Sequence, residues 1–234
     1  MSRTTAVLEA AAARAAAVVE RGGTRASRPS QRRAAEDAPA GGAYVTARTQ
    51  MSMRDAASGD GALRFEGMAS VYEPADHGAA DHVCRGYQMW DMFGPYTEVV
   101  AAGAAADTLA NPDLDCPLVL GHDQLRRIAR TTNGTLTLTS DATGLRAQAV
   151  LDPEDEDVEY IAPKIAAGLI DEMSFCFRIT AGQWSPDYTE YRIEKFDLHR
   201  GDVAIVGFGA NPATTAALRS ASPAAVRLAL AAAL

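Results

Sequence analysis

The feature that most constrains the fold is a regular alternation of apolar and polar side chains between Leu136 and Leu151. Leucine alternates with threonine up to Thr139, and leucine or alanine occupies every second position from Leu145 onward. A period of two is typical of a strand with one buried face. Turn-forming residues separate the two runs, so we predict that residues 128–139 and 144–151 pair as a β-hairpin.

Other stretches add strands and helices to this hairpin. Apolar runs or alternating patterns predict strands at residues 62–72, 87–100, 117–120, 168–178, 191–198 and 199–206. In the second of these strands, we expect Trp90, Met92 and Phe93 to supply core. Helices are predicted at residues 4–21, 101–109, 158–167 and 222–234. We expect the acidic run 152–157 to cap a helix rather than to bind calcium.

Charge divides the chain into two parts. Residues 1–54 contain nine arginines and four acidic residues, a net charge of +5, whereas residues 55–234 carry −13. The first part is an alanine-rich helical stretch followed by a linker rich in Arg, Ser, Pro and Gly. We therefore predict an N-terminal extension at 1–54, a folded domain at 55–220 and a C-terminal helix at 221–234. A basic extension suits an acidic protein surface or a nucleic acid, or it serves solubility alone.

The composition disfavours membrane and disulfide-rich proteins. No uninterrupted apolar run reaches about 18 residues, and the N-terminus lacks the continuous apolar core of a signal peptide. Three cysteines, Cys84, Cys116 and Cys176, are scattered without CxxC spacing. This pattern predicts free thiols rather than disulfides or zinc ligands. We therefore expect an intracellular protein.

Ser174 is the hydroxyl that stands in the middle of the apolar β-type run 168–178. In a strand of this register, Phe175 and Phe177 face one side, and Ser174 and Cys176 face the other. A serine in this position is either a small core residue or a nucleophile. The second interpretation requires a base within hydrogen-bond reach and a third group that orients the base.

Two residues qualify as those partners. His122 follows the apolar strand 117–120, where a side chain projects from a rigid sheet into a loop. Asp202 stands at the start of the strand that ends at residue 206. Each residue also has an ordinary structural interpretation: the histidine as a hydrogen-bonded core residue, and the aspartate as a carboxylate that accepts from nearby backbone N–H groups.

A metal site is the weaker alternative for the histidines. His77, His82 and Cys84 lie close together in a polar loop, and a metal-dependent hydrolase would use His77, His82 and His122. Metal-binding pairs of this kind normally have a matched pair elsewhere in the chain, and none is evident. We therefore predict no metal and no other cofactor.

These residues occur in segments that together resemble a known family. The segments are Glu98-Val-Val-Ala-Ala-Gly-Ala104, Leu118-Val-Leu-Gly-His122-Asp, Gly144-Leu with the strand after it, Met173-Ser174-Phe-Cys-Phe-Arg178 and Leu198-His-Arg-Gly-Asp202-Val-Ala-Ile-Val206, followed by Ala210-Asn211-Pro212. In order and spacing they resemble the prohead (capsid maturation) proteases of tailed phages, over about Leu63 to Ala216. Those enzymes look like relatives of the herpesvirus assemblins, serine proteases with a β-barrel wrapped by helices. The resemblance implies an α+β fold with a mostly antiparallel, barrel-like core.

The resemblance also implies roles for three residues. Ser174 is the implied nucleophile, His122 the general base and Asp202 the orienting acid, at a position where many members carry glutamate. Two positions depart from the usual pattern, because Cys176 replaces a small residue and Ala204 replaces a serine. Since the third residue of the assemblins is a histidine, His199 is a rival for the orienting role. A regular strand would place His199 and Asp202 on opposite faces, so at most one should reach His122.

The function implied by the resemblance is a serine endopeptidase inside the immature procapsid, in the host cytoplasm. It would cut the scaffold portion of the major capsid protein, and usually itself. We expect the major capsid protein and its scaffold segment as partners, with a homo-oligomer left open and neither membrane nor nucleic acid involved. The helical, basic segment 1–50 would be a detachable element for packaging. The alternative is a non-enzymatic capsid-assembly or scaffold protein on the same fold, with Ser174 and His122 far apart.

Overall fold

The fold was analysed in a computed structural model, which describes residues 3–22, 28–29, 33–34, 51–55, 63–73 and 86–207. Strands predominate, as expected for an α+β protein of this pattern. The elements are α1 (Arg3–Glu20), β1 (Arg33–Ala34), β2 (Met51–Asp55), β3 (Leu63–Val71), β4 (Tyr87–Asp91), β5 (Gly94–Val100), α2 (Ala106–Leu109), β6 (Pro117–Leu120), β7 (Arg127–Arg130), the 3-10 helix η2 (Thr131–Asn133), β8 (Leu136–Ser140), β9 (Gly144–Leu151), α3 (Glu156–Ala166), β10 (Glu172–Trp184) and β11 (Glu190–Val206).

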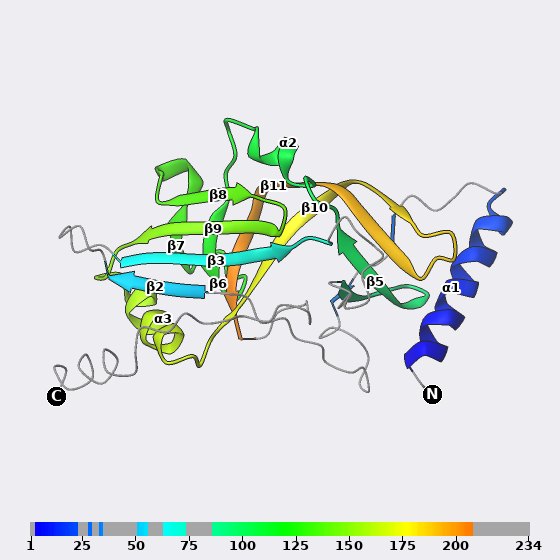
Figure 1. Ribbon diagram of the computed structural model, residues 1–234, viewed down its shortest axis with the longest axis horizontal. Helices are drawn as coiled ribbons and strands as arrows, with labels where there is room; N and C mark the ends of the chain where they lie inside the picture. Colours follow the sequence, from blue (N-terminus) through cyan, green and yellow to red (C-terminus); the bar gives the residue numbers. More distant parts are fainter. Residues whose placement is uncertain are drawn as a thin grey trace.

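Within these ranges the strands form two sheets (Figure 1). A four-stranded antiparallel sheet has the order β2-β3-β9-β8. A seven-stranded sheet has the order β1-β4-β5-β11-β6-β7, and β10 pairs with β11. β11 is parallel to both β5 and β6, while the other pairs are antiparallel. The predicted barrel-like core is not observed: in the described residues the strands form two open sheets with β7 and β8 as edge strands, and no closed barrel is formed.

A single apolar core joins the two sheets. Phe65 and Leu151 of the four-stranded sheet belong to the same buried cluster as Leu118 and Val203 of the seven-stranded sheet. Helix α3 adds three buried side chains at helical spacing, Val158, Ile161 and Ile165. Burial of apolar surface stabilises the fold by about 25 cal/mol per Å². One face of the β6–β11–β10 region is thereby committed to this core, and the other face carries a small second buried cluster of Val119, Ala204 and Val206 together with polar side chains.

We predicted one extended strand at residues 87–100. The structure instead has a hairpin of two strands there, β4 and β5. The Asp91 carboxylate accepts hydrogen bonds from the backbone N–H groups of Phe93 and Gly94, at 2.9 and 3.2 Å. An aspartate that binds its own backbone in this way initiates a turn. Met92 lies at the tip and is 50% exposed, so the expectation that it supplies core was wrong.

Two other local predictions are confirmed, and one is modified. Asp155 caps α3 by accepting from the N–H groups of Asp157 and Val158, at 2.8 and 3.2 Å, as the acidic run predicted. β8 and β9 form the predicted hairpin. However, the first part of segment 128–139 is the separate strand β7, which pairs with β6 in the other sheet. The predicted C-terminal helix lies outside the described residues.

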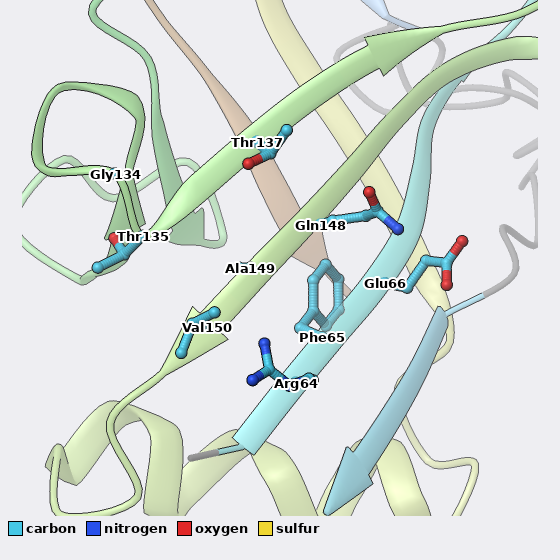
Figure 2. A pocket seen from close by; sticks show the side chains of 9 residues that line it. All are labelled: Arg64, Phe65, Glu66, Gly134, Thr135, Thr137, Gln148, Ala149 and Val150. Atoms are coloured by element: carbon cyan, nitrogen blue, oxygen red, sulfur yellow. The ribbon is translucent and has the colours of Figure 1, made fainter. Parts of the chain in front are cut away.

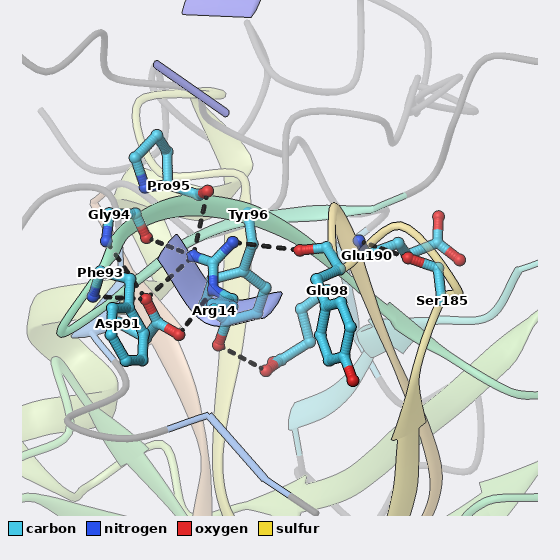
Figure 3. A network of polar contacts seen from close by, with 10 residues as sticks. Arg14, Asp91, Phe93, Gly94, Pro95, Tyr96, Glu98, Ser185 and Glu190 are labelled. Atoms are coloured by element: carbon cyan, nitrogen blue, oxygen red, sulfur yellow. Dashed lines mark hydrogen bonds and ion pairs between the residues drawn. The ribbon is translucent and has the colours of Figure 1, made fainter. Parts of the chain in front are cut away.

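Helix α1 confirms the predicted helix at 4–21 and packs against the β4–β5 hairpin through a buried arginine (Figure 3). Arg14 is 2% exposed, and its guanidinium donates to both carboxylate oxygens of Asp91, at 2.8 and 2.9 Å. It also donates to the carbonyls of Gly94, Pro95 and Tyr188. Its guanidinium carbon lies over the rings of Tyr96 and Trp184, 5.3 and 4.9 Å from their centroids. The N-terminal helix is therefore anchored to the body of the protein in this structure.

Candidate active site

Ser174 lies on the sheet face that points away from the core. In the antiparallel pair of β10 and β11, Ser174 is opposite Ala204 and Cys176 is opposite Asp202. Directly opposite residues share a face, so all four side chains are on the same side of the sheet. The intervening Phe175 is part of the main core, whereas Ser174 is half-buried and Cys176 is exposed. The predicted alternation along this strand is confirmed.

The loop after β6 brings His122 to this face. Gly121 donates its backbone N–H to the carbonyl of Ile205 at 2.9 Å, which fixes the loop to β11. Gly121 and His122 both adopt the left-handed backbone region, with φ of 62° and 60°. This conformation is uncommon for a residue other than glycine, and such strained positions cluster at functional sites. The turn places the histidine beside the start of the last segment of β11.

His122 and Asp202 form a short hydrogen bond, with 2.6 Å between Nδ1 and Oδ1. The Asp202 side chain is 3% exposed, whereas the His122 side chain is 38% exposed. Because a carboxylate only accepts hydrogen bonds, Nδ1 is the nitrogen that carries the proton in this pair. The other ring nitrogen, Nε2, then has a free lone pair when the imidazole is neutral. This is the tautomer that a general base requires.

Ser174 and Asp202 are diagonal neighbours across the β10–β11 pair, since Ser174 faces Ala204, two residues beyond Asp202. Diagonal neighbours have Cα atoms roughly 7–8 Å apart. The carboxylate that binds the His122 ring is therefore a diagonal neighbour of Ser174 on this face. The structure has no hydrogen bond between Ser174 and His122, both of which are described; catalytic hydrogen bonds are often long until substrate is bound.

His199, the rival for the third position, is directed elsewhere. Its Nδ1 accepts the backbone N–H of Asp115 at 3.3 Å, so Asp202 rather than His199 contacts His122. The cause is an irregularity in the strand pair, where four residues of β11 lie opposite Phe177 alone, between the pairs Cys176–Asp202 and Arg178–Asp197.

Glycine makes that irregularity possible. A Cβ atom on Gly201 would lie 2.0 Å from the carbonyl oxygen of Cys176, so a larger residue would clash with the neighbouring strand. The preceding Arg200 has a φ of 61°. The expectation that residues 199 and 202 lie on opposite faces assumed a regular strand, which this bulge interrupts. The bulge directs the Arg200 side chain to solvent and Asp202 toward His122.

Gln124 is a site residue that the sequence reasoning missed. Its Nε2 donates to the second oxygen of the Asp202 carboxylate at 2.6 Å, so both oxygens of this buried group are hydrogen-bonded. Its Oε1 accepts from Arg127 at 3.1 Å, and these two partners fix the orientation of the amide. No sequence pattern singles out a glutamine two residues after the histidine.

An open depression of about 290 Å³ lies next to this carboxylate. Three arginines line it, Arg127, Arg130 and Arg200. The rest of its wall is formed by Asp115, Pro117, Gln124 and Gly201. The hydrogen bond of Arg130 lowers the pKa of the Asp115 carboxyl below its usual value, so Asp115 is charged at neutral pH. We call this region the basic depression.

A second depression, of about 360 Å³, lies on the four-stranded sheet and is lined by residues of β3, β8 and β9 (Figure 2). Its wall contains Glu66, Arg64, Thr137 and Gln148, and none of the predicted catalytic residues. Nothing in its chemistry connects it with Ser174.

The cysteines differ in their environment. Cys116 is buried, and burial together with the nearby charge of Asp202 raises the pKa of its thiol to about 12. Cys176 is exposed beside Ser174. Both are free thiols, as predicted, and Cys84 lies outside the described residues.

Of the three histidines of the metal alternative, the structure describes His122. His77 and His82 lie outside the described residues, and within the described ranges no group of three or more ligating side chains is found. Among the helices described, none is long and apolar enough to cross a membrane.

A serine on the same sheet face as a buried carboxylate that binds the Nδ1 of a histidine has the parts of a serine hydrolase. The chain belongs to the caudovirus prohead serine protease family, whose family model matches residues 49–227. It is therefore a member of a peptidase family of phage capsid maturation, as the sequence resemblance predicted. Ser174, His122 and Asp202 lie within the matched segment, whereas α1 precedes it. No match was found among curated proteins or among solved structures.

Proposed function

We propose that this protein is the serine endopeptidase that cuts the scaffold portion of the major capsid protein, and itself, inside the immature procapsid in the host cell. The observation that carries the proposal is the 2.6 Å contact between His122 and Asp202 on the sheet face that holds Ser174. Family membership supports the reaction class and the capsid context. The non-enzymatic alternative gives no reason for a buried carboxylate to orient an exposed imidazole.

In the proposed mechanism, His122 Nε2 removes the proton from Ser174 as the serine oxygen attacks a peptide carbonyl. The same nitrogen then protonates the leaving amine, and a water molecule repeats the sequence to release the acyl group. Asp202 holds Nδ1 and stabilises the imidazolium that forms. Gln124 keeps the carboxylate in place from its other oxygen.

The oxyanion requires donors near Ser174. Backbone N–H groups are the natural candidates, and one such donor is worth about 3 kcal/mol in other hydrolases. Arg178, on the same strand, donates to the Asp197 carboxylate at 2.6 Å and to the His199 carbonyl at 3.3 Å. Since its guanidinium is already bound, we assign it no part in this role.

The test is the intact mass of this chain and of its cognate capsid protein after co-expression. Wild type should yield shortened species that Ser174→Ala abolishes. Thr137→Ala, which removes an exposed hydroxyl from the four-stranded sheet, should cut as wild type does. Identical uncut masses for wild type and Ser174→Ala in assembled shells would instead favour the assembly-protein alternative.

We also propose that the basic segment 1–50 secures packaging by binding scaffold or capsid protein. Its charge and its position before the matched segment support this role. Deletion of residues 1–50 also removes Arg14 from Asp91, so circular dichroism must first show that the shortened chain folds. The amount of folded protease found in procapsids should then fall. Normal incorporation of the shortened chain would rule the packaging role out.

A further inference from the structure

The basic depression contains arginines whose charges are only partly neutralised. Arg130 donates two hydrogen bonds to the carboxylate of Asp115, at 2.7 and 2.6 Å. Arg127 instead donates to the backbone and side-chain oxygens of Gln124, which carry no charge. Arg200 is exposed, and within the described residues its side chain has no hydrogen-bond partner. With three arginines and one carboxylate, Asp115, in its wall, the depression has an excess of two positive charges on a chain whose net charge is −8.

The pairing of the strands fixes the distance of this charge from Ser174. Ser174 is opposite Ala204, Ala204 is beside Val119, and Val119 is opposite Arg127. These four residues form one row across β10, β11, β6 and β7. Neighbouring strands are about 4.8 Å apart, so the Cα atoms of Ser174 and Arg127 are separated by about 14 Å. Since an extended peptide advances about 3.3 Å per residue, this span corresponds to about four residues.

Val119 and Ala204 are fully buried, so this row sets the separation and is not itself the path of a substrate. The basic depression is nevertheless joined to the candidate site by hydrogen bonds. Arg127 binds Gln124, Gln124 binds Asp202, and Asp202 binds His122. The side chain of Gln124 would therefore be the one link between a ligand bound to Arg127 and the Asp202 carboxylate, which orients the base.

We propose that the basic depression is a substrate subsite for an acidic side chain, three to five residues from the cleaved peptide bond. The inference rests on the proposed protease function and adds a class of substrate to it. A guanidinium fork matches the two oxygens of a carboxylate, which makes aspartate or glutamate the fitting side chain. The negative charge of residues 55–234 repels acidic peptides in general, so the two arginines supply local attraction where it is needed.

The experiment uses the purified full-length protein and a pool of peptides derived from a proteome. Mass spectrometry identifies the new ends produced by wild type and absent with Ser174→Ala. We expect aspartate and glutamate to be enriched at one position, three to five residues from the cut. Two synthetic peptides are then made from the best-cleaved sequence, with glutamate or glutamine at that position.

The measured quantity is the ratio of kcat/KM for the glutamate peptide to that for the glutamine peptide. One charge-assisted contact corresponds to about tenfold in this ratio, which Arg200→Gln should lower and the double substitution Arg127→Gln with Arg200→Gln should abolish. Glutamine occupies the left-handed backbone of position 200 at the same conformational cost as arginine, so the variant tests the charge. Arg200→Glu should favour a lysine peptide. Arg21→Gln, at an exposed position after α1, is the matched control and should keep the wild-type ratio.

The possible outcomes distinguish a failure of the proposed subsite from a failure of the proposed protease function. Cleavage that depends on Ser174 but shows no acidic preference, or a preference unchanged by Arg200→Gln and Arg127→Gln, would overturn the subsite and leave the protease intact. If wild type cuts neither the peptide pool nor the cognate capsid protein, the proposed function and the subsite both fail.

Discussion

His122 and Asp202 are 80 residues apart in the sequence, and their side chains meet at 2.6 Å. The contact joins a loop that follows β6 to the segment of β11 that is parallel to β6. It makes a chemically specific prediction, because the carboxylate sets both the tautomer and the orientation of the imidazole.

Asp202→Asn should preserve the fold and abolish most activity. Asparagine has the same shape, but an amide donor beside Nδ1 favours the wrong tautomer of His122. By analogy with other serine proteases, we expect kcat to fall by a factor on the order of 10⁴. Capsid-protein cleavage and circular dichroism would be measured on the same preparations. Activity within tenfold of wild type would show that Asp202 does not orient the base.

Gln124→Leu should affect both turnover and stability. The variant leaves one oxygen of the buried Asp202 carboxylate without its hydrogen bond, at a cost of about 1–3 kcal/mol in the free energy of unfolding. Because Gln124 is a positioning residue, we expect kcat to fall about tenfold while KM changes less than about twofold. The exposed Gln148 provides the matched control, Gln148→Leu, which should change neither quantity. A change confined to KM would argue against the positioning role.

Arg14→Met should release α1 from the body of the protein. The substitution keeps an unbranched side chain but leaves the Asp91 carboxylate buried without its cation, which typically costs about 3–5 kcal/mol. Hydrogen exchange of the α1 amides should rise strongly relative to wild type. Arg21→Met, at an exposed arginine, should have no such effect. Equal protection of α1 in both variants would mean that the ion pair does not hold the helix.

The two described cysteines should react differently with iodoacetamide at pH 7.5. Cys176 is exposed, whereas burial raises the pKa of Cys116 to about 12 and leaves its thiol protonated and inaccessible. Peptide mapping should find the native protein alkylated at Cys176 and both residues alkylated after unfolding. Rapid native labelling of Cys116 would contradict its burial.

The same pKa predicts a loss of stability at alkaline pH. Because the folded pKa is raised, the contribution of Cys116 is fully present below the ordinary thiol pKa of 9.0 and is lost as pH rises toward about 12. Between these limits, wild type should lose about 1.4 kcal/mol per pH unit relative to Cys116→Ala. Urea unfolding at several pH values measures the two slopes, and parallel slopes would refute the assignment.

The sequence by itself determined the local structure and the class of protein. Alternation with a period of two located β8, β9 and β10, and it placed Ser174 on the face opposite Phe175. The acidic run located the cap of α3. These features depend on interactions between residues that are close in the chain, which is why a linear pattern contains them. The motif segments likewise predicted the protease family.

The tertiary structure decided which distant residues meet. The sequence offered Asp202 and His199 for one role, and the bulge at Gly201 turned His199 toward Asp115 and left Asp202 at His122. The tertiary structure also brought Gln124 to Asp202 and Arg14 of the N-terminal helix to Asp91. These contacts depend on strand register, on parallel pairing between separated segments and on the docking of a helix. Such relations arise from packing the whole chain, and no local pattern of residues contains them.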